Sequence, residues 1–295
     1  MDLSLGIVLE QNYIQTIISL KSKSSLTNQT KFGLWFKLIY NHSMKSQDPH
    51  QEHLQSIINL YTEGQLQQAL SESSQMLERF PNSVILYNIA GASNAALMQF
   101  DAAIESYKQA LRIKPDYADA YYNMGVALND KGDPEAAIES YKQALRIKPD
   151  YAKAYNNMGV ALNDKGDPEA AIESYKQALR IKPDYADAYN NMGSALKDKG
   201  DLEEAIDSYK QALRIKPDYA EGHSNLGDAL QLLNQTEPAL ASYEKAISLK
   251  KDLNTAISGL GMALLKKGEH SEGLDKLRQG DGSILFNIKS GLSIK

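Results

Sequence analysis

The sequence of 295 residues contains no cysteine. This absence excludes a disulfide framework, a thiolate metal site and a cysteine nucleophile. The short motifs of common catalytic and phosphate-binding sites are also missing: there is no Gly-x-Gly-x-x-Gly, no phosphate-binding loop, no His-Glu-x-x-His and no Gly-x-Ser-x-Gly. The five histidines are scattered, and we interpret His50 and His53 as surface residues rather than metal ligands. We therefore expect no catalytic residues, no cofactor and no metal, that is, a protein that is not an enzyme.

Basic charge and long apolar runs are scarce as well. The net charge is -5 and the pI is about 5.6, which argues against nucleic acid as the main partner because phosphate binding needs a basic face. Asp2 and Glu10 interrupt the apolar patches of the first twenty residues, so this stretch cannot span a bilayer and is a poor signal peptide. We expect a cytoplasmic protein without a membrane span, whose oligomeric state the sequence leaves open.

What the chain does contain is a repeat. Proline recurs every 34 residues, at Pro81, Pro115, Pro149, Pro183 and Pro217, and the segment between Pro115 and Pro217 consists of three nearly identical units. A fixed period of about 20 to 50 residues indicates stacked supersecondary units rather than one globular core. Function must then be sought on the surface of that stack.

The first half of each unit predicts a helix. Asp116 follows a proline and is expected to be its N-cap. One apolar face then recurs at i, i+3, i+4 and i+7, through Tyr121, Met124, Gly125 and Leu128. We expect this face to pack inside the repeat.

The second half predicts another helix, antiparallel to the first. Gly132 suits a left-handed C-cap for the first helix, Asp133 the next N-cap, and Pro134 the first helical position. The small residues of both helices should allow a close approach, with tyrosine filling the gaps. The expected buried face of the second helix is Ala137, Ile138, Tyr141, Ala144 and Leu145.

These residues resemble the tetratricopeptide repeat (TPR) family, whose period and helix-turn-helix unit they share. The resemblance covers residues 50–279 and implies an all-α, right-handed α-solenoid of about seven repeats that binds other proteins. Eight positions carry it in each of three copies: Tyr121, Met124, Gly125, Leu128, Ala137, Tyr141, Ala144 and Pro149, then Tyr155, Met158, Gly159, Leu162, Ala171, Tyr175, Ala178 and Pro183, then Tyr189, Met192, Gly193, Leu196, Ala205, Tyr209, Ala212 and Pro217.

We predict repeat boundaries from this register. The seven units are residues 50–83, 84–117, 118–151, 152–185, 186–219, 220–253 and 254–279. Met98 replaces the turn glycine of the second unit, and Gly273 and Gly280 replace both alanines of the seventh, which leaves the packing of that unit open.

The two ends lie outside the period. Residues 1–49 are an extension that we interpret as a leader without fixed structure or a capping helix; a basic amphipathic helix over residues 31–40, and translation beginning at Met44, are alternatives. Residues 280–295 could form a small hairpin, but we favour an extended tail over the last apolar face, or the stub of a further domain.

The nearly identical units differ mainly at places spaced by three, four and three residues along the first helix, which trace one stripe. Stacking should align these stripes into a continuous surface, which in the TPR family is the concave groove. The predicted peptide-binding residues are Asp119, Tyr122, Asn123, Val126, Asn129, Lys153, Asn156, Asn157, Asn163, Asp187, Asn190, Asn191, Ser194, Lys197, Glu221, Asn225 and Asp228.

An asparagine repeats beside the stripe without change, at Asn123, Asn157, Asn191 and Asn225. Its amide could pair with the backbone of an extended peptide, and this ladder is similar to the one in the TPR superhelix of O-linked N-acetylglucosamine transferases. The alternative is that these amides bond to the neighbouring repeat, and both roles could hold together.

Charge on the stripe limits the partner. Lysine and arginine clamps for a terminal carboxylate occur in chaperone-binding relatives, whereas here Asp119, Asp187, Glu221 and Asp228 outnumber Lys153 and Lys197. Such a groove suits neutral or basic peptide segments. We therefore predict a scaffold or adaptor for extended peptides, the alternative being the substrate-recruiting arm of a glycosyltransferase or other transferase whose catalytic domain lies elsewhere.

Overall fold

The computed structural model describes residues 48–281, 284–287 and 291–294. The predictions for the leader, for the helix over residues 31–40 and for a start at Met44 lie outside the described residues. The chain divides into two compact units, Met1–Ser93 and Asn94–Lys295, which we describe separately.

The first unit contains α3 (Gln51–Thr62), α4 (Leu66–Arg79) and the beginning of α5 (Val84–Ala96). Ile57, Ala69, Leu86 and Ile89 form its buried core. Ser83 is buried just before α5, and its hydroxyl accepts a hydrogen bond from the backbone N–H of Leu86 at 3.2 Å. This side chain thereby supplies one of the partners that the first turn of a helix lacks.

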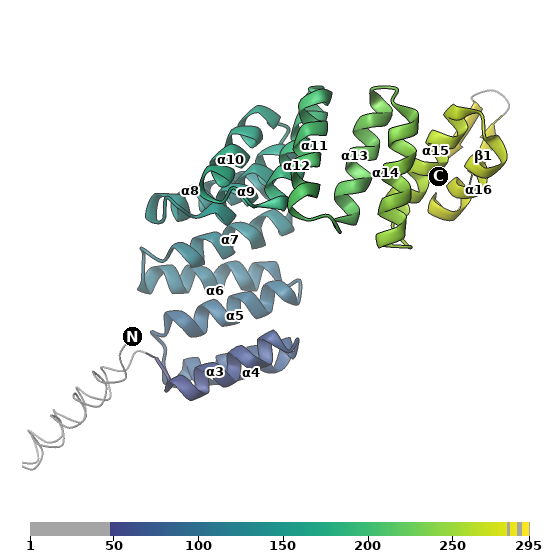
Figure 1. The fold of residues 1–295 in the computed structure, drawn as a ribbon. Helices are drawn as coiled ribbons and strands as arrows, with labels where there is room; N and C mark the ends of the chain where they lie inside the picture. The colour runs from purple at the N-terminus through teal and green to yellow at the C-terminus, as the bar shows by residue number, and fades with distance from the viewer. Residues whose placement is uncertain (1–47, 282–283, 288–290, 295) are drawn as a thin grey trace, which may run out of the picture. The chain divides into compact units, whose positions relative to one another are not determined.

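The second unit is a series of antiparallel helix pairs joined by short turns (Figure 1). The predicted all-α helical repeat solenoid is confirmed. After α6 (Phe100–Ile113) the helices are α7 (Ala118–Lys131), α8 (Pro134–Ile147), α9 (Ala152–Asp164), α10 (Pro168–Ile181), α11 (Ala186–Lys199), α12 (Leu202–Ile215), α13 (Ala220–Leu232), α14 (Thr236–Leu249), α15 (Asn254–Lys267) and α16 (His270–Asp281).

The second helix of a repeat begins as its sequence predicts. The Asp133 carboxylate accepts a hydrogen bond from the N–H of Ala136 at 3.1 Å, with Pro134 at the first helical position. The prediction for the first helix was wrong: α7 begins at Ala118 with Tyr117 as N-cap, and no side chain caps it. Asp116 is thus one residue too early to serve, because the turn after proline runs on to Tyr117.

The turn between paired helices needs a left-handed residue. Gly132 closes α7 with φ of 91°, as predicted, and Gly166 and Gly200 take the same conformation. Met98 and Asn234 occupy this conformation without being glycine, with φ of 59° and 61°. A side chain in this region is strained, most of all one that is not Asn or Asp, so Met98 is the costlier of the two.

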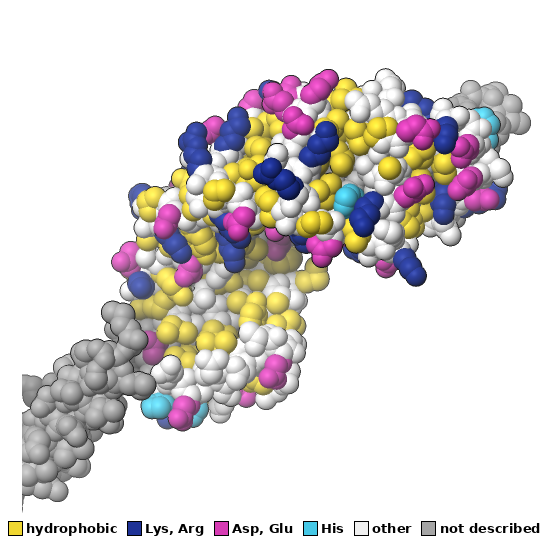
Figure 2. All heavy atoms as spheres, in the orientation of Figure 1, with side chains coloured by type: hydrophobic (Ala, Val, Ile, Leu, Met, Phe, Trp, Pro, Cys, Tyr) yellow, Lys and Arg dark blue, Asp and Glu magenta, His cyan; other side chains and the backbone are white. Residues whose placement is uncertain are grey.

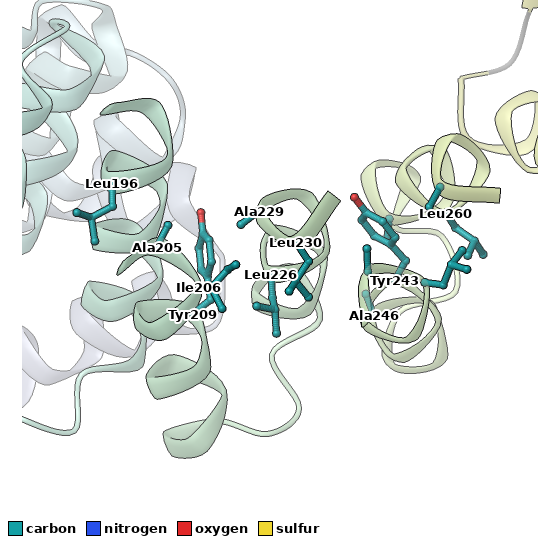
Figure 3. Packing of buried hydrophobic residues seen from close by; sticks show 14 of the residues in the cluster. Leu196, Ala205, Ile206, Tyr209, Leu226, Ala229, Leu230, Tyr243, Ala246 and Leu260 are labelled. Atoms are coloured by element: carbon teal, nitrogen blue, oxygen red, sulfur yellow. The ribbon is translucent and has the colours of Figure 1, made fainter. Parts of the chain in front are cut away.

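A buried tyrosine in each second helix fixes how closely the pair approaches. Tyr141 is 1% exposed, and a Cβ atom added at Gly125 would lie 2.6 Å from its ring. Equivalent pairs recur along the array, and Figure 3 shows Tyr209 and Tyr243 among the core side chains that link consecutive repeats. The predicted buried face of α8 is confirmed at all five positions.

The predicted packing face of α7 was only partly right. Gly125 is buried, but Tyr121, Met124 and Leu128 are half-buried, whereas Ala120 and Ala127 are fully covered. Only small residues fit where α7 meets its neighbours most closely. The larger side chains lie in the gap between the flanking second helices.

The two helices of the last repeat, α15 and α16, pack differently from those of earlier repeats. Cβ atoms added at Gly261 or Gly273 would each lie 2.9 Å from the carbonyl oxygen of the other glycine, so α15 and α16 meet backbone to backbone. Leu277 is fully buried where earlier repeats have tyrosine. Gly273, which stands where earlier repeats have alanine, therefore allows a closer helix pair.

The favoured reading of residues 280–295 as an extended tail was wrong. β1 (Ile284–Asn287) pairs antiparallel with β2 (Gly291–Ile294), in a register that places Ile284 opposite Ile294. β1 also contacts α16. Contact with a helix supplies the support that a hairpin this short lacks by itself.

The arrangement of the helices distinguishes two sides of the second unit. The first helices of consecutive repeats contact one another, α7 with α9, α9 with α11, α11 with α13 and α13 with α15. From α8 to α14, each second helix packs instead against the first helices before and after it. We call the side on which the first helices meet the inner face, and the side lined by second helices the outer face.

Candidate peptide-binding face

The structure places the predicted site residues at three depths of the inner face. Asp119, Lys153, Asp187 and Glu221 are exposed, whereas Asn156 and Asn190 are buried. The half-buried remainder are Tyr122, Asn123, Val126, Asn129, Asn157, Asn163, Asn191, Ser194, Lys197, Asn225 and Asp228.

The repeated asparagines bond to the preceding repeat. Asn191 Nδ2 donates to Asn156 Oδ1 at 3.2 Å, and Asn225 Nδ2 donates to Asn190 Oδ1 at 3.0 Å. The inter-repeat role that the sequence left open is therefore present. Asn156 and Asn190, at 5% and 6% exposure, were wrongly predicted to be surface residues, because the next repeat covers them.

A small cavity lies between α7 and α9 in repeats three and four. Its volume is about 140 Å³, and Val126, Asn129, Asn157 and Val160 line it together with the Tyr141 side chain of α8. Within the described structure, Asn129 Oδ1 is buried and has no hydrogen-bond partner. A buried acceptor without a donor is costly, so this cavity is suited to a ligand that brings an N–H group.

A second cavity, of about 410 Å³, lies further along the same face. Lys197, Asp228, Gln231, Leu232 and Lys266 line it, and Leu232 is 58% exposed. Sequence reasoning missed Gln231, Leu232 and Lys266. Gln231 and Leu232 lie three periods after Asn129 and Asp130, so extending the stripe into the less regular repeats would have found them.

Asp228 is a carboxylate of this face whose surroundings alter its acidity. The Tyr243 hydroxyl donates to its Oδ1 at 2.8 Å. Burial raises the pKa of Asp228 above its ordinary value, although that hydrogen bond and the charge of Lys197 oppose the shift. The charged form of the Asp228 side chain is therefore poorly hydrated, and the exposed Leu232 lines the same cavity.

We expect Asp228→Asn to change stability in a pH-dependent way. In the pH range between the ordinary and the raised pKa, folded protein binds more protons than unfolded protein, so the contribution of Asp228 falls as pH rises through the raised value. Asparagine does not titrate and its oxygen still accepts from Tyr243. The variant should therefore gain stability relative to wild type from about pH 4 towards neutral pH.

Urea unfolding at a series of pH values measures this difference. Tyr243→Phe is the matched control, since removing the donor should enlarge the pH-dependent loss. Parallel stability curves for wild type and Asp228→Asn would disprove the assignment.

Tyrosines precede the first helices, with Tyr151 as the N-cap of α9 and Tyr219 as the N-cap of α13. Tyr151 hydrogen-bonds to Asp119 of the preceding repeat, and Lys148 Nζ lies 4.4 Å over its ring. Tyr219 bonds to Asp187 in the same way, and burial, followed by the Asp187 charge, raises its pKa to about 12. The two carboxylates therefore already have a partner in the next repeat.

The part of the chain that the structure describes lacks two features. No group of three or more His, Asp or Glu side chains in this part of the chain could hold a metal ion. No helix there is long and apolar enough to cross a membrane.

Comparison with known families identifies the class of this chain. A "TPR repeat" profile matches residues 96–132, 125–166, 159–200 and 193–234, and a "Tetratricopeptide repeat" profile matches residues 220–253. Together these matches cover more than half of the chain. The chain belongs to the tetratricopeptide repeat family.

One curated relative is the probable UDP-N-acetylglucosamine–peptide N-acetylglucosaminyltransferase SEC of Arabidopsis thaliana, 36% identical over 76 residues. The match covers 26% of this chain and 8% of that enzyme. The similarity is thus confined to a small part of the relative.

Two solved structures share the fold. The Cut9–Hcn1 complex of the APC/C matches with a TM-score of 0.66 and 16% identity, over 92% of this chain and 56% of the other. YrrB, described as a TPR protein with an unusual peptide-binding site, matches with a TM-score of 0.51 and 22% identity, over 63% of this chain and 95% of its own.

Proposed function

We propose that this protein is a non-catalytic adaptor whose inner face binds an extended segment of a partner polypeptide. The observation that carries the proposal is the cavity between α7 and α9, in which a buried Asn129 oxygen lacks a donor. A peptide N–H would satisfy that oxygen, and Val126 and Val160 would contact the adjoining side chain. The peptide-binding site described for the similarly folded YrrB is in keeping with this role.

The repeats also limit which residues contact the ligand. Asn156 and Asn190 are covered and belong to the wall between repeats. The surface left for the peptide combines half-buried valines with exposed Asp119, Lys153 and Asp187. It would favour neutral or basic segments, because its carboxylates outnumber its lysines.

We expect Val126→Asp combined with Val160→Asp to weaken this binding strongly with little loss of structure. Aspartate stands at the equivalent position as Asp228, where a tyrosine hydroxyl donates to it, so the fold should accept the change. Twelve-residue peptides selected from a displayed library on the full chain should lose about tenfold or more in affinity. Fluorescence anisotropy measures the affinity and circular dichroism the fold.

The control is Lys142→Glu with Lys176→Glu, two exposed changes on second helices. Affinity that fell with the control pair and not with the valine pair would refute an inner-face site. Failure of the library to yield any binder would refute the adaptor role itself.

A second candidate function is the recruitment of polypeptide substrates for a transferase. The segment that is 36% identical to the Arabidopsis glycosyltransferase favours it. Capture from the cells of origin with this chain as bait should then enrich N-acetylglucosaminyltransferase activity, assayed with UDP-N-acetylglucosamine. Captured material without such activity would rule this candidate out.

A further inference from the structure

The outer face has a groove that the inner-face function does not use. An open cavity of about 660 Å³ lies over α7, with α6 and α8 as its walls. We call it the outer groove. It is lined by Ile104, Glu105 and Lys108 of α6, by Tyr121, Met124 and Leu128 of α7, and by Asp133, Ala136 and Glu139 at the start of and along α8, among others.

The floor of the outer groove is apolar. Tyr121, Met124 and Leu128 are half-buried, and Ile104 is 7% exposed beneath them. Methionine adapts its shape to different apolar partners, and half-buried aromatic and aliphatic side chains are the usual contacts of an inserted anchor residue. The groove can therefore accept an apolar side chain such as leucine or phenylalanine.

Its rim is acidic. Asp101, Glu105, Asp133 and Glu139 surround the floor, against Lys108 and Lys131. Lys131 Nζ lies 2.6 Å from Asp101 and is thereby committed to that carboxylate. Arg112 lies 3.9 Å from Glu105, so Asp133 and Glu139 remain against Lys108. This smaller excess of negative charge complements a lysine or arginine and repels an acidic segment.

The same residues recur one and two periods later. Between α8 and α10 the corresponding floor is Tyr155, Met158 and Leu162, all half-buried, and Lys165 pairs with Glu135 as Lys131 does with Asp101. Tyr189, Met192 and Leu196 follow between α10 and α12, where Leu196 is buried and Lys199 pairs with Asp201. Figure 2 shows apolar side chains lying between acidic and basic ones over this unit.

We propose that the outer groove and its repeats bind a basic, apolar segment of a partner polypeptide. One apolar side chain inserts above Met124, and an adjacent lysine or arginine pairs with Glu105 and Glu139 at the rim. A partner with several such segments would bind successive grooves and gain affinity from their linkage. This interaction is independent of peptide binding on the inner face.

The methionines provide a direct test in the full chain. With ¹³C-methyl methionine, the signals of Met124, Met158 and Met192 report on three grooves in one spectrum. The probe is a twelve-residue peptide of alternating leucine and lysine; its counterpart replaces each lysine by glutamate. The lysine peptide should shift all three signals, and the glutamate peptide should shift none.

A double variant tests the groove at Met124 separately from the groove at Met192. Glu105→Lys with Glu139→Lys should weaken the response of Met124 by about tenfold or more. The groove at Met192 keeps its own rim, Glu173 and Asp207, so its response should be unchanged and serves as the internal control. Circular dichroism verifies that these exposed changes leave the helices intact.

Three results would overturn the proposal: equal shifts with both peptides, bound lysine peptide with no shift at these methionines, or loss of all three shifts on Val126→Asp with Val160→Asp. The last would assign the lysine peptide to the inner face. The inner-face proposal is tested separately, by the affinity of the library-selected peptides for the variant with Val126→Asp and Val160→Asp.

Discussion

Replacing Gly159 by leucine is expected to lower the free energy of unfolding by about 1 to 3 kcal/mol. Even a single Cβ atom there would lie 2.6 Å from Cε1 of Tyr175, well inside normal contact distance. Tyr175 is 2% exposed and packed in the continuous core of the array, so its ring cannot move aside. Urea unfolding followed by far-ultraviolet circular dichroism measures the loss.

The neighbouring residue is a matched control. Val160→Leu also enlarges a side chain of α9, but it lies at the cavity of the inner face and has room to enter. Val160→Leu should therefore change the midpoint of the urea unfolding transition little. Equal destabilisation by the two variants would mean that the glycine–tyrosine contact does not set the helix spacing.

Much of the fold could be predicted because the same local sequence signals recur in successive repeats. Asp133, Pro134 and Gly132 are local signals that act within one turn of chain, and all three behave as expected. The buried face of α8 could be predicted as well, since its alanine, isoleucine and tyrosine side chains recur at the spacing of one helix face.

Periodicity does not reveal which neighbour a face meets. Tyr121 and Met124 belong to the apolar face of α7, yet the tightest contacts go to alanines and Gly125. Whether a large side chain is covered depends on the spacing of second helices on both sides, which no single repeat encodes. The outer groove was missed for that reason.

The inner face shows the same limit for polar residues. Asn156 and Asn157 are adjacent in sequence, but Asn156 is buried, whereas Asn157 is half-buried and donates to the Tyr122 hydroxyl of the preceding repeat. A stripe of variable residues locates the face but not the depth of each side chain. The free acceptor of Asn129 could be recognised only once the distances to its neighbours were known.

The structure also changes how the asparagine ladder should be tested. Removing Asn191 or Asn225 affects the junction between repeats as well as any ligand. A loss of peptide binding in such variants would therefore not distinguish the two roles, whereas the valine pair leaves the ladder in place.

The combined variant Asn191→Ala and Asn225→Ala is expected to lose about 2 to 6 kcal/mol of stability. Each change removes the donor to a buried amide oxygen, Asn156 Oδ1 in one case and Asn190 Oδ1 in the other. An orphaned buried acceptor costs about 1 to 3 kcal/mol, and the two junctions should add approximately. Because repeat arrays need not unfold in two states, the comparison uses urea transitions of the whole chain fitted repeat by repeat.

Asn163→Ala is the control that isolates burial from hydrogen bonding. Asn163 Nδ2 also donates to the next repeat, at 3.1 Å, but its acceptor is the exposed carboxylate of Asp198, which water can serve. Its loss should cost about 0.5 kcal/mol or less. If Asn163→Ala destabilised the array as much as Asn191→Ala, the cost would come from losing the inter-repeat contact itself rather than from leaving a buried acceptor unpaired.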